Sequence, residues 1–290
     1  MTSETQPSLF RRLLGHPLAL ALVQPVLLLG IFVLFKATLL KPGLALFLDK
    51  ESEAYSLVQG SITVFVVLGL YVLFVRIFEK RSASELSLGA LPRNGLLGIA
   101  LGAGVIGFLF VLLWMFGAWR IDGLHDPRAY MLATVWVLSM ATFEELAFRG
   151  FAYRHIEQWL GTIAALALSG ALFGGLHITN EGATAISVFS AATGGVLMGV
   201  LYSWSGSLWL PIFFHTSWNS AQAFFGSNVS GIDIFSAYFA STREGPEWLT
   251  GGAFGIENSY VTIGLLWLII IFALIRLATS GKLRGARSAP

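Results

Sequence analysis

The chain has 290 residues, of which 56% are hydrophobic and 12% are charged, and its formal net charge is +2. This charged share is about half that of a typical soluble domain, so the composition is that of a membrane protein. The sequence contains no cysteine, which excludes disulfides, thiolate catalysis and thiolate metal sites. The small positive charge calls for no nucleic-acid partner, because basic loops at a membrane surface account for it.

Apolar runs long enough to cross a hydrocarbon core of about 30 Å recur along almost the whole chain. They predict an all-α, polytopic integral membrane protein with about eight transmembrane helices in one bundle, and a single membrane domain at residues 1–290. The predicted spans are residues 18–40, 55–75, 96–119, 129–151, 161–178, 183–204, 207–225 and 259–275. The first is not a signal peptide, because no small-residue cleavage site follows its apolar stretch.

Basic residues are concentrated in the terminal segments and the even-numbered connections, as Arg11, Arg12, Arg81, Arg154 and Arg284 illustrate. The positive-inside rule makes these segments cytoplasmic, so both termini are predicted to lie inside. The lack of cysteine and the small size favour the inner membrane of a bacterial cell.

Small residues in the fifth and sixth spans would let helix backbones approach closely. They are Gly170, Gly174, Gly175, Gly194, Gly195 and Gly199. The longest connection, residues 226–258, is rich in Gly and Ser but also carries aromatic residues, including Phe235. It is predicted as an interfacial or re-entrant segment or as a free loop.

The fourth span contains three charged residues, Glu144, Glu145 and Arg149. Each such charge costs about 2.5 to 3.5 kcal/mol at the centre of a membrane helix, so the three together point to a function. Glu145 and Arg149 are four residues apart and can form an ion pair on one helix face. Glu144 is rotated by about 100° from Glu145 and is free to face a cavity. Mutual neutralisation of the charges is the simpler alternative.

Two further clusters have the same four-residue spacing, Phe173 with His177 and His215 with Asn219. An antiparallel hairpin turning near Gly161 would bring Glu144 and His177 to one level near the middle of the bilayer. Taken alone, each cluster could equally serve structural hydrogen bonding. Together, a carboxylate and a histidine can hold and deprotonate water, and a second histidine with an amide can donate hydrogen bonds to an oxyanion.

With these motifs, the chain resembles the CPBP family, the CAAX proteases and bacteriocin-processing enzymes, also called the Abi family, that include the Ras-converting CAAX endopeptidase. The family pattern EExxxR, FxxxH and HxxxN is matched in order, and the resemblance covers about residues 129–225 as a catalytic core. It implies an intramembrane endopeptidase that hydrolyses a peptide bond of a membrane-associated protein or peptide.

The resemblance also implies roles for the motif residues. Glu144 would be the general base, His177 its partner in positioning water, and His215 with Asn219 the oxyanion hole. Glu145, Arg149 and Phe173 would orient the site. We expect no cofactor, although Glu144, His177 and His215 could bind zinc with water in the fourth position of a metalloprotease.

Two other classes of function stay open from the sequence. One is a non-hydrolytic scaffold or bacteriocin self-immunity protein, and the other is a proton-coupled carrier that uses Glu144 and the histidines as a relay. The expected partners are membrane lipid and a protein or peptide substrate. Whether that substrate is prenylated, and the oligomeric state, stay open.

Overall fold

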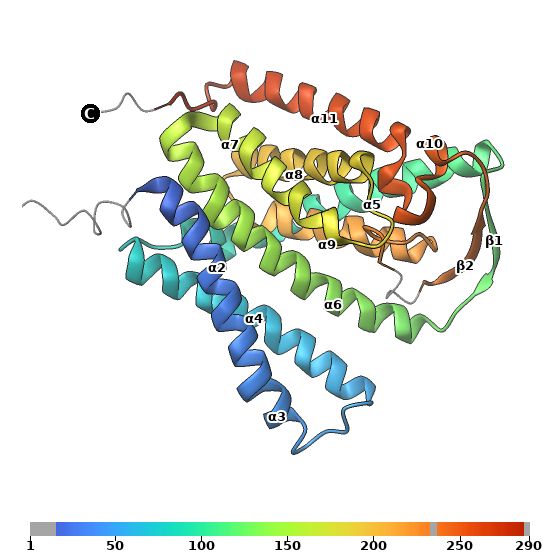
Figure 1. Cartoon of the computed structure of the whole chain (residues 1–290), viewed down its shortest axis with the longest axis horizontal. Coiled ribbons are helices and arrows are strands. Elements are labelled where there is room, and N and C mark those ends of the chain that lie inside the picture. Colours follow the sequence, from blue (N-terminus) through green and yellow to red (C-terminus); the bar gives the residue numbers. More distant parts are fainter. Residues whose placement is uncertain (1–15, 233–236, 287–290) are drawn as a thin grey trace, which may run out of the picture.

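The computed structural model describes residues 16–232 and 237–286, and helices form most of it (Figure 1). Arg11, Arg12 and Phe235 lie outside the described residues. The long helices are α2 (Pro17–Phe35), α4 (Glu53–Phe78), α5 (Leu91–Met115), α6 (Pro127–Glu145), α7 (Arg154–Leu176), α8 (Ala185–Ser205), α9 (Trp209–Phe224) and α11 (Tyr260–Thr279). Helix α2 is continued by the π-helix η1 (Lys36–Leu40) and by α3 (Lys41–Leu44).

Shorter elements connect these helices. They are the 3-10 turns Ser84–Leu86, Leu88–Ala90, His177–Thr179, Gly252–Phe254 and Ile256–Asn258, and α10 (Glu247–Thr250). The strands β1 (Trp119–Leu124) and β2 (Phe239–Arg243) pair antiparallel and are the departure from an otherwise all-helical fold in the described part of the chain. The third span was predicted to reach Trp119, but α5 ends at Met115 and Trp119 begins β1.

Six helical segments of the described chain are long and apolar enough to cross a membrane. They are residues 17–44, 53–78, 88–115, 127–179, 185–205 and 260–279. The all-α class and the integral membrane nature are therefore confirmed, and the count of eight spans is approximate. The fourth segment has 53 residues and contains both arms of a folded helix, and α9, with 16 residues, is shorter than the others.

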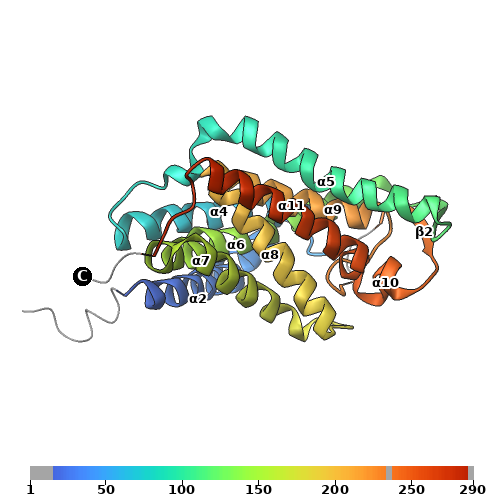
Figure 2. The same cartoon turned by 90° about the horizontal axis from the view of Figure 1, so that it is seen from above.

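The helical chain reverses direction at Gly161, which has φ 82° and ψ 172°. A Cβ atom there would lie 2.6 Å from the carbonyl oxygen of Arg284, so both the backbone conformation and the space require glycine. The second arm of α7 returns alongside the first (Figures 1 and 2). The predicted hairpin between the fourth and fifth spans is confirmed.

A π-helical segment, η4 (Leu146–Tyr153), follows directly after the two glutamates. We expected a regular α-helix here, so the extra residue per turn is a correction to that expectation. Such π-segments often occur at functional sites. The segment is almost wholly buried, including Arg149 and Phe151, and α2 and α7 pack against it.

Close helix approach explains several glycines but not all of those expected. A Cβ atom at Gly174 would lie 2.6 Å from the Val188 carbonyl oxygen, and one at Gly195 would lie 3.0 Å from the Cα of Gly170. Cβ atoms at Gly175 and Gly194 would meet nothing within 4 Å. The packing prediction is therefore right for the first group and wrong for Gly175 and Gly194, which face open space.

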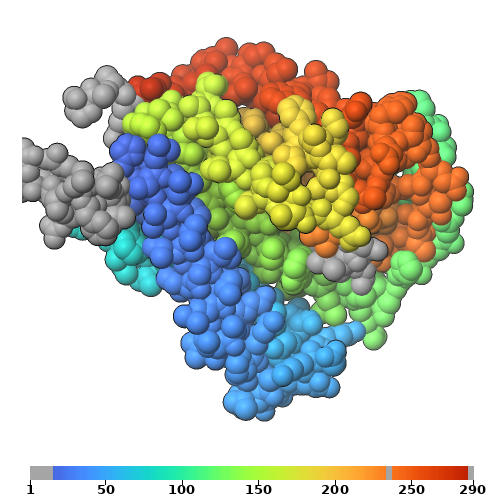
Figure 3. All heavy atoms as spheres, viewed as in Figure 1, coloured from blue at the N-terminus to red at the C-terminus, as the bar shows by residue number. Residues whose placement is uncertain are grey.

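Helix α9 lies inside the bundle against α5. Added Cβ atoms at Gly98 and Gly102 would lie 2.7 Å from the Leu210 carbonyl oxygen and 2.2 Å from the Ser217 hydroxyl. Outside this core, α3 and the adjoining ends of α2 and α4 project from the bundle as a lobe (Figures 1 and 3). Helix α9 corresponds to the predicted seventh span. Because neighbouring helices cover it, its polar residues lie in the protein interior and not against lipid.

Candidate active site

The charged pair of the first motif lies in the fully buried interior. Arg149 Nη1 donates to Glu145 Oε1 at 3.0 Å, and neither side chain has any exposed surface. Arg149 Nη2 donates to the carbonyl oxygen of Gly195 at 2.8 Å, and its guanidinium carbon lies 4.8 Å from the centroid of the Phe173 ring. The predicted Glu145–Arg149 pair is confirmed, and Phe173 covers it.

Glu145 also holds a residue of another helix. His215 Nδ1 lies 2.9 Å from the same Oε1 atom of Glu145, which links α9 to α6. A carboxylate only accepts when ionised, so Nδ1 carries the proton of this hydrogen bond. The charged pair therefore fixes the orientation of the His215 ring, a contact that the sequence did not predict.

Glu144 faces away from this pair, as its predicted rotation on the helix requires. Its side chain is 25% exposed, and its Oε2 lies 3.8 Å from Nε2 of His215. That separation is too long for a direct hydrogen bond. Glu144 therefore presents a carboxylate next to an imidazole without being engaged by it.

Glu144 opens into a cavity of about 210 Å³ formed between α6, α7 and α9. Its walls include Glu144, Phe173, His177, His215 and Asn219. The three motifs, predicted to meet at one level, are thus brought together around one space. The cavity volume is enough for water and part of a ligand.

His177 ends α7 and begins the following 3-10 turn. Its Nδ1 lies 2.8 Å from the carbonyl oxygen of Phe173, so Nδ1 is the donor. In the neutral tautomer, Nε2 then has a free lone pair that can accept a hydrogen bond from water. Asn219 lies one helical turn after His215 and is half-buried on the same cavity wall.

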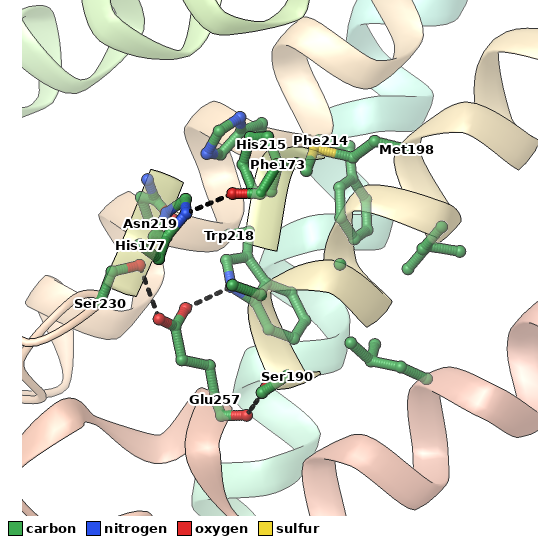
Figure 4. A pocket seen from close by; sticks show the side chains of 14 residues that line it. Phe173, His177, Ser190, Met198, Phe214, His215, Trp218, Asn219, Ser230 and Glu257 are labelled. Atoms are coloured by element: carbon green, nitrogen blue, oxygen red, sulfur yellow. Dashed lines mark hydrogen bonds between the residues drawn. The ribbon is translucent and has the colours of Figure 1, made fainter. Parts of the chain in front are cut away.

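A second, smaller cavity of about 40 Å³ shares lining residues with the first, and Figure 4 shows the side chains that line it. His177, His215 and Asn219 line both cavities, as does Ser230. Glu257 also lines the smaller cavity, and the sequence did not identify it as a functional candidate. The available signal was its place: a carboxylate just before the last apolar span.

Glu144, His177 and His215 are not arranged as a zinc site in this structure. The described residues contain no group of three His, Asp or Glu side chains that could hold a metal ion. His215 Nδ1 is engaged by Glu145 and His177 Nδ1 by Phe173, which leaves the two Nε2 atoms and Glu144 as donors. These atoms do not converge as a metal site in the described chain.

The fold and the site define a helical membrane protein with a carboxylate, two histidines and an amide around a buried cavity. Residues 126–221, from α6 to α9, match the family model of the type II CAAX prenyl endopeptidase Rce1-like proteins. No curated protein and no solved structure matches the chain. The family resemblance shown by the three motifs is confirmed by this match, and the family is one of membrane endopeptidases.

Proposed function

We propose that this protein is an intramembrane endopeptidase that hydrolyses a peptide bond of a membrane-associated protein or peptide with water activated by Glu144. The observation that carries the proposal is the shared cavity of Glu144, His177, His215 and Asn219. These side chains come from three helical arms, and a purely structural role would not require an open space between them.

In the proposed reaction, water lies between the Glu144 carboxylate and Nε2 of His177. Glu144 takes a proton as the water oxygen bonds to the carbonyl carbon, and the π electrons of the carbonyl move onto its oxygen. The oxyanion then reforms the carbonyl, the carbon–nitrogen bond breaks, and Glu144 returns the proton to the leaving amine. Atoms and charge balance without a metal or cofactor.

His215 and Asn219 are proposed to donate hydrogen bonds to the oxyanion. Asn219 does so through its amide nitrogen. His215 already uses Nδ1–H toward Glu145, so it donates through Nε2 only when both ring nitrogens are protonated. The buried Glu145–Arg149 pair is then a positioning device that holds this ring in place.

We further propose that both termini are cytoplasmic and that the protein lies in a bacterial inner membrane. In support, a network of charged residues gathers at the end of the bundle predicted to face the cytosol. Arg81 pairs with Glu79 and Glu85, Arg154 pairs with Glu79, and Arg284 pairs with Glu157.

The experiment is a comparison of protein termini by mass spectrometry. Native cells with the wild type are compared with cells that carry Glu144→Gln at equal expression. Termini that occur only with the wild type would support proteolysis and reveal the cleavage sequence. Identical termini, together with a preserved cellular phenotype, would overturn the proposal in favour of a scaffold or self-immunity protein.

A further inference from the structure

Glu257 is a buried carboxylate next to the catalytic cavity without a cationic partner in the described part of the chain. It lies in the 3-10 turn before α11, and its residue is only 8% exposed. A buried carboxylate is costly unless it is well hydrogen-bonded. Its burial at the end of the 226–258 connection, against α9, therefore calls for an explanation.

Both carboxylate oxygens of Glu257 accept hydrogen bonds. The Ser230 hydroxyl donates to Oε1 at 2.6 Å, while Trp218 Nε1 and Gln222 Nε2 donate to Oε2 at 3.2 and 3.0 Å (Figure 4 shows the first two). In addition, the Ser190 hydroxyl of α8 donates to the backbone carbonyl of Glu257. A carboxylate engaged in this way holds its donors in place and is not free to act as a second base.

Two of these donors belong to the catalytic stretch of α9. Trp218 and Gln222 are one turn apart, and Asn219 lies between them in the chain. At 3.6 residues per turn, Gln222 and Asn219 are about 60° apart around the helix axis. Hydrogen bonds to Trp218 and Gln222 therefore limit rotation of α9 about its axis, which sets the direction of Asn219.

A different face of α9 is fixed by α5, where Gly98 and Gly102 allow backbone contact. Glu257 supplies the second point of attachment. Because α9 lies between these two supports, loss of the Glu257 bonds would leave the helix free to turn or shift while it stays packed against α5.

The third donor, Ser230, is one of the residues that line both cavities. Its backbone has φ 50°, in the left-handed region that a residue other than glycine rarely adopts. Asn180 Nδ2 donates to its carbonyl oxygen at 2.8 Å, so the turn is held through its backbone by Asn180 and through its side chain by Glu257. Strained backbone of this kind persists where the surroundings enforce it.

From this arrangement we propose that Glu257 is a positioning residue of the active site. It fixes the rotation of α9 and the Ser230 turn so that Asn219 is aimed at the oxyanion. The inference rests on the proposed function, because it concerns the geometry of that same site. It assigns the connection before α11 a part in catalysis, although that connection lies outside the matched residues 126–221.

The test is steady-state kinetics of Glu257→Gln in lipid vesicles, on a peptide that spans a cleavage site found by the comparison of termini. The amide keeps the size of the side chain but removes the negative charge and leaves one accepting oxygen in place of two, so the hydrogen bonds to its three donors are weakened. We expect kcat to fall about 10- to 100-fold with KM unchanged, since small misplacement of a catalytic group has effects of this size. Glu247→Gln, in exposed α10, is the matched control and should keep wild-type kcat.

A double variant separates positioning from a general loss of structure. If Glu257 acts through Asn219, adding Glu257→Gln to Asn219→Ala should lower kcat much less than it does in the wild type. The inference would be overturned if the fold-loss of kcat in the double variant equalled the product of the two single losses. A Glu257→Gln variant with wild-type kcat would also overturn it. In both cases cleavage by the wild type and its loss in Glu144→Gln would leave the proposed function standing. If the wild type does not cleave the peptide, both proposals fail together.

Discussion

Arg149 is the charged side chain of the site with the most buried contacts. Neither Arg149 nor its partner Glu145 has any exposed side-chain surface. It neutralises Glu145, holds the Gly195 carbonyl oxygen and packs on the Phe173 ring. Removing one partner of a buried pair leaves the other charge uncompensated. Arg149 therefore links α6 to the backbone of α8 at Gly195, and its partner Glu145 contacts the His215 ring.

Arg149→Ala is expected to lower the free energy of unfolding by about 3 to 5 kcal/mol, because Glu145 is then buried alone. The measurement is the yield of monodisperse protein and its midpoint of thermal unfolding in detergent. Arg120→Ala is the control, since Arg120 is an exposed residue whose ion pairs with Asp122 and Glu244 contribute little. Equal midpoints for both variants would contradict this role of Arg149.

The sequence predicted residue contacts along a helix better than contacts between helices. The spacing of Glu145 and Arg149 identified their ion pair, and the rotation of Glu144 placed it toward a cavity. The bond from His215 to Glu145 could not be predicted, because it depends on how α9 is turned relative to α6. The hydrogen bonds of Glu257 could not be predicted for the same reason, since the side chains that donate to its carboxylate lie 27 to 39 residues away in the chain.

At the scale of elements, glycines determine where helices touch. Gly174 and Gly175 are neighbours in α7, yet a Cβ atom at Gly174 would lie 2.6 Å from the Val188 carbonyl oxygen, and one at Gly175 would meet nothing within 4 Å. Alanine at Gly174 would therefore change both helix packing and helix propensity, whereas alanine at Gly175 would change helix propensity alone.

We expect Gly174→Ala to lower the unfolding midpoint, because α7 and α8 must move apart. Gly175→Ala should leave it unchanged or raise it, since alanine favours a helix by about 1 kcal/mol over glycine. Thermal unfolding of both variants in the same detergent measures the difference. A Gly174→Ala variant as stable as Gly175→Ala would contradict a close α7–α8 contact at Gly174.

Element boundaries followed from the sequence only where a local signal exists. A turn near Gly161 was expected from the boundary between the fourth and fifth apolar spans, and it needs the left-handed backbone that glycine supplies. The π-helix after Glu145 was not predicted, because it results from packing against α2 and α7. The β1–β2 pair was also missed, since two strands far apart in the chain carry no periodic signal of their mutual pairing.

On the scale of the whole molecule, charged residues at one end of the bundle tie several helices together. Glu79, directly after α4, accepts from Arg81 and Arg154 and lies 3.5 Å from Nε2 of His155. Burial raises the pKa of Glu79, but hydrogen bonds from His155, Arg154 and Arg81 outweigh it and lower the pKa from 4.5 to about 2.

This shift predicts a pH dependence of stability. A lowered pKa in the folded state means that Glu79 stabilises the protein above about pH 4.5, and that this stabilisation is lost as the pH falls from 4.5 toward 2. Thermal unfolding of the wild type and Glu79→Gln between these pH values measures it. The two midpoints should converge as the pH falls, and a constant difference over that range would contradict the assignment.

Hydropathy predicted the membrane architecture because the bilayer requires long apolar helices. It was least informative for α9, whose polar residues are buried by neighbouring helices rather than by lipid. Burial of that helix is a property of the assembled bundle. The sequence therefore predicts that the chain spans the membrane more reliably than it predicts the number of spans.

The central claim is that Glu144 activates the water that cleaves the peptide bond. The most direct measurement is kcat of purified wild type and Glu144→Gln in lipid vesicles on the identified peptide, with thermal unfolding as the control for folding. We expect kcat to fall by about 100- to 10,000-fold, which is the usual effect of losing a general base, while the unfolding midpoint stays unchanged. A folded Glu144→Gln protein with wild-type kcat would contradict the claim.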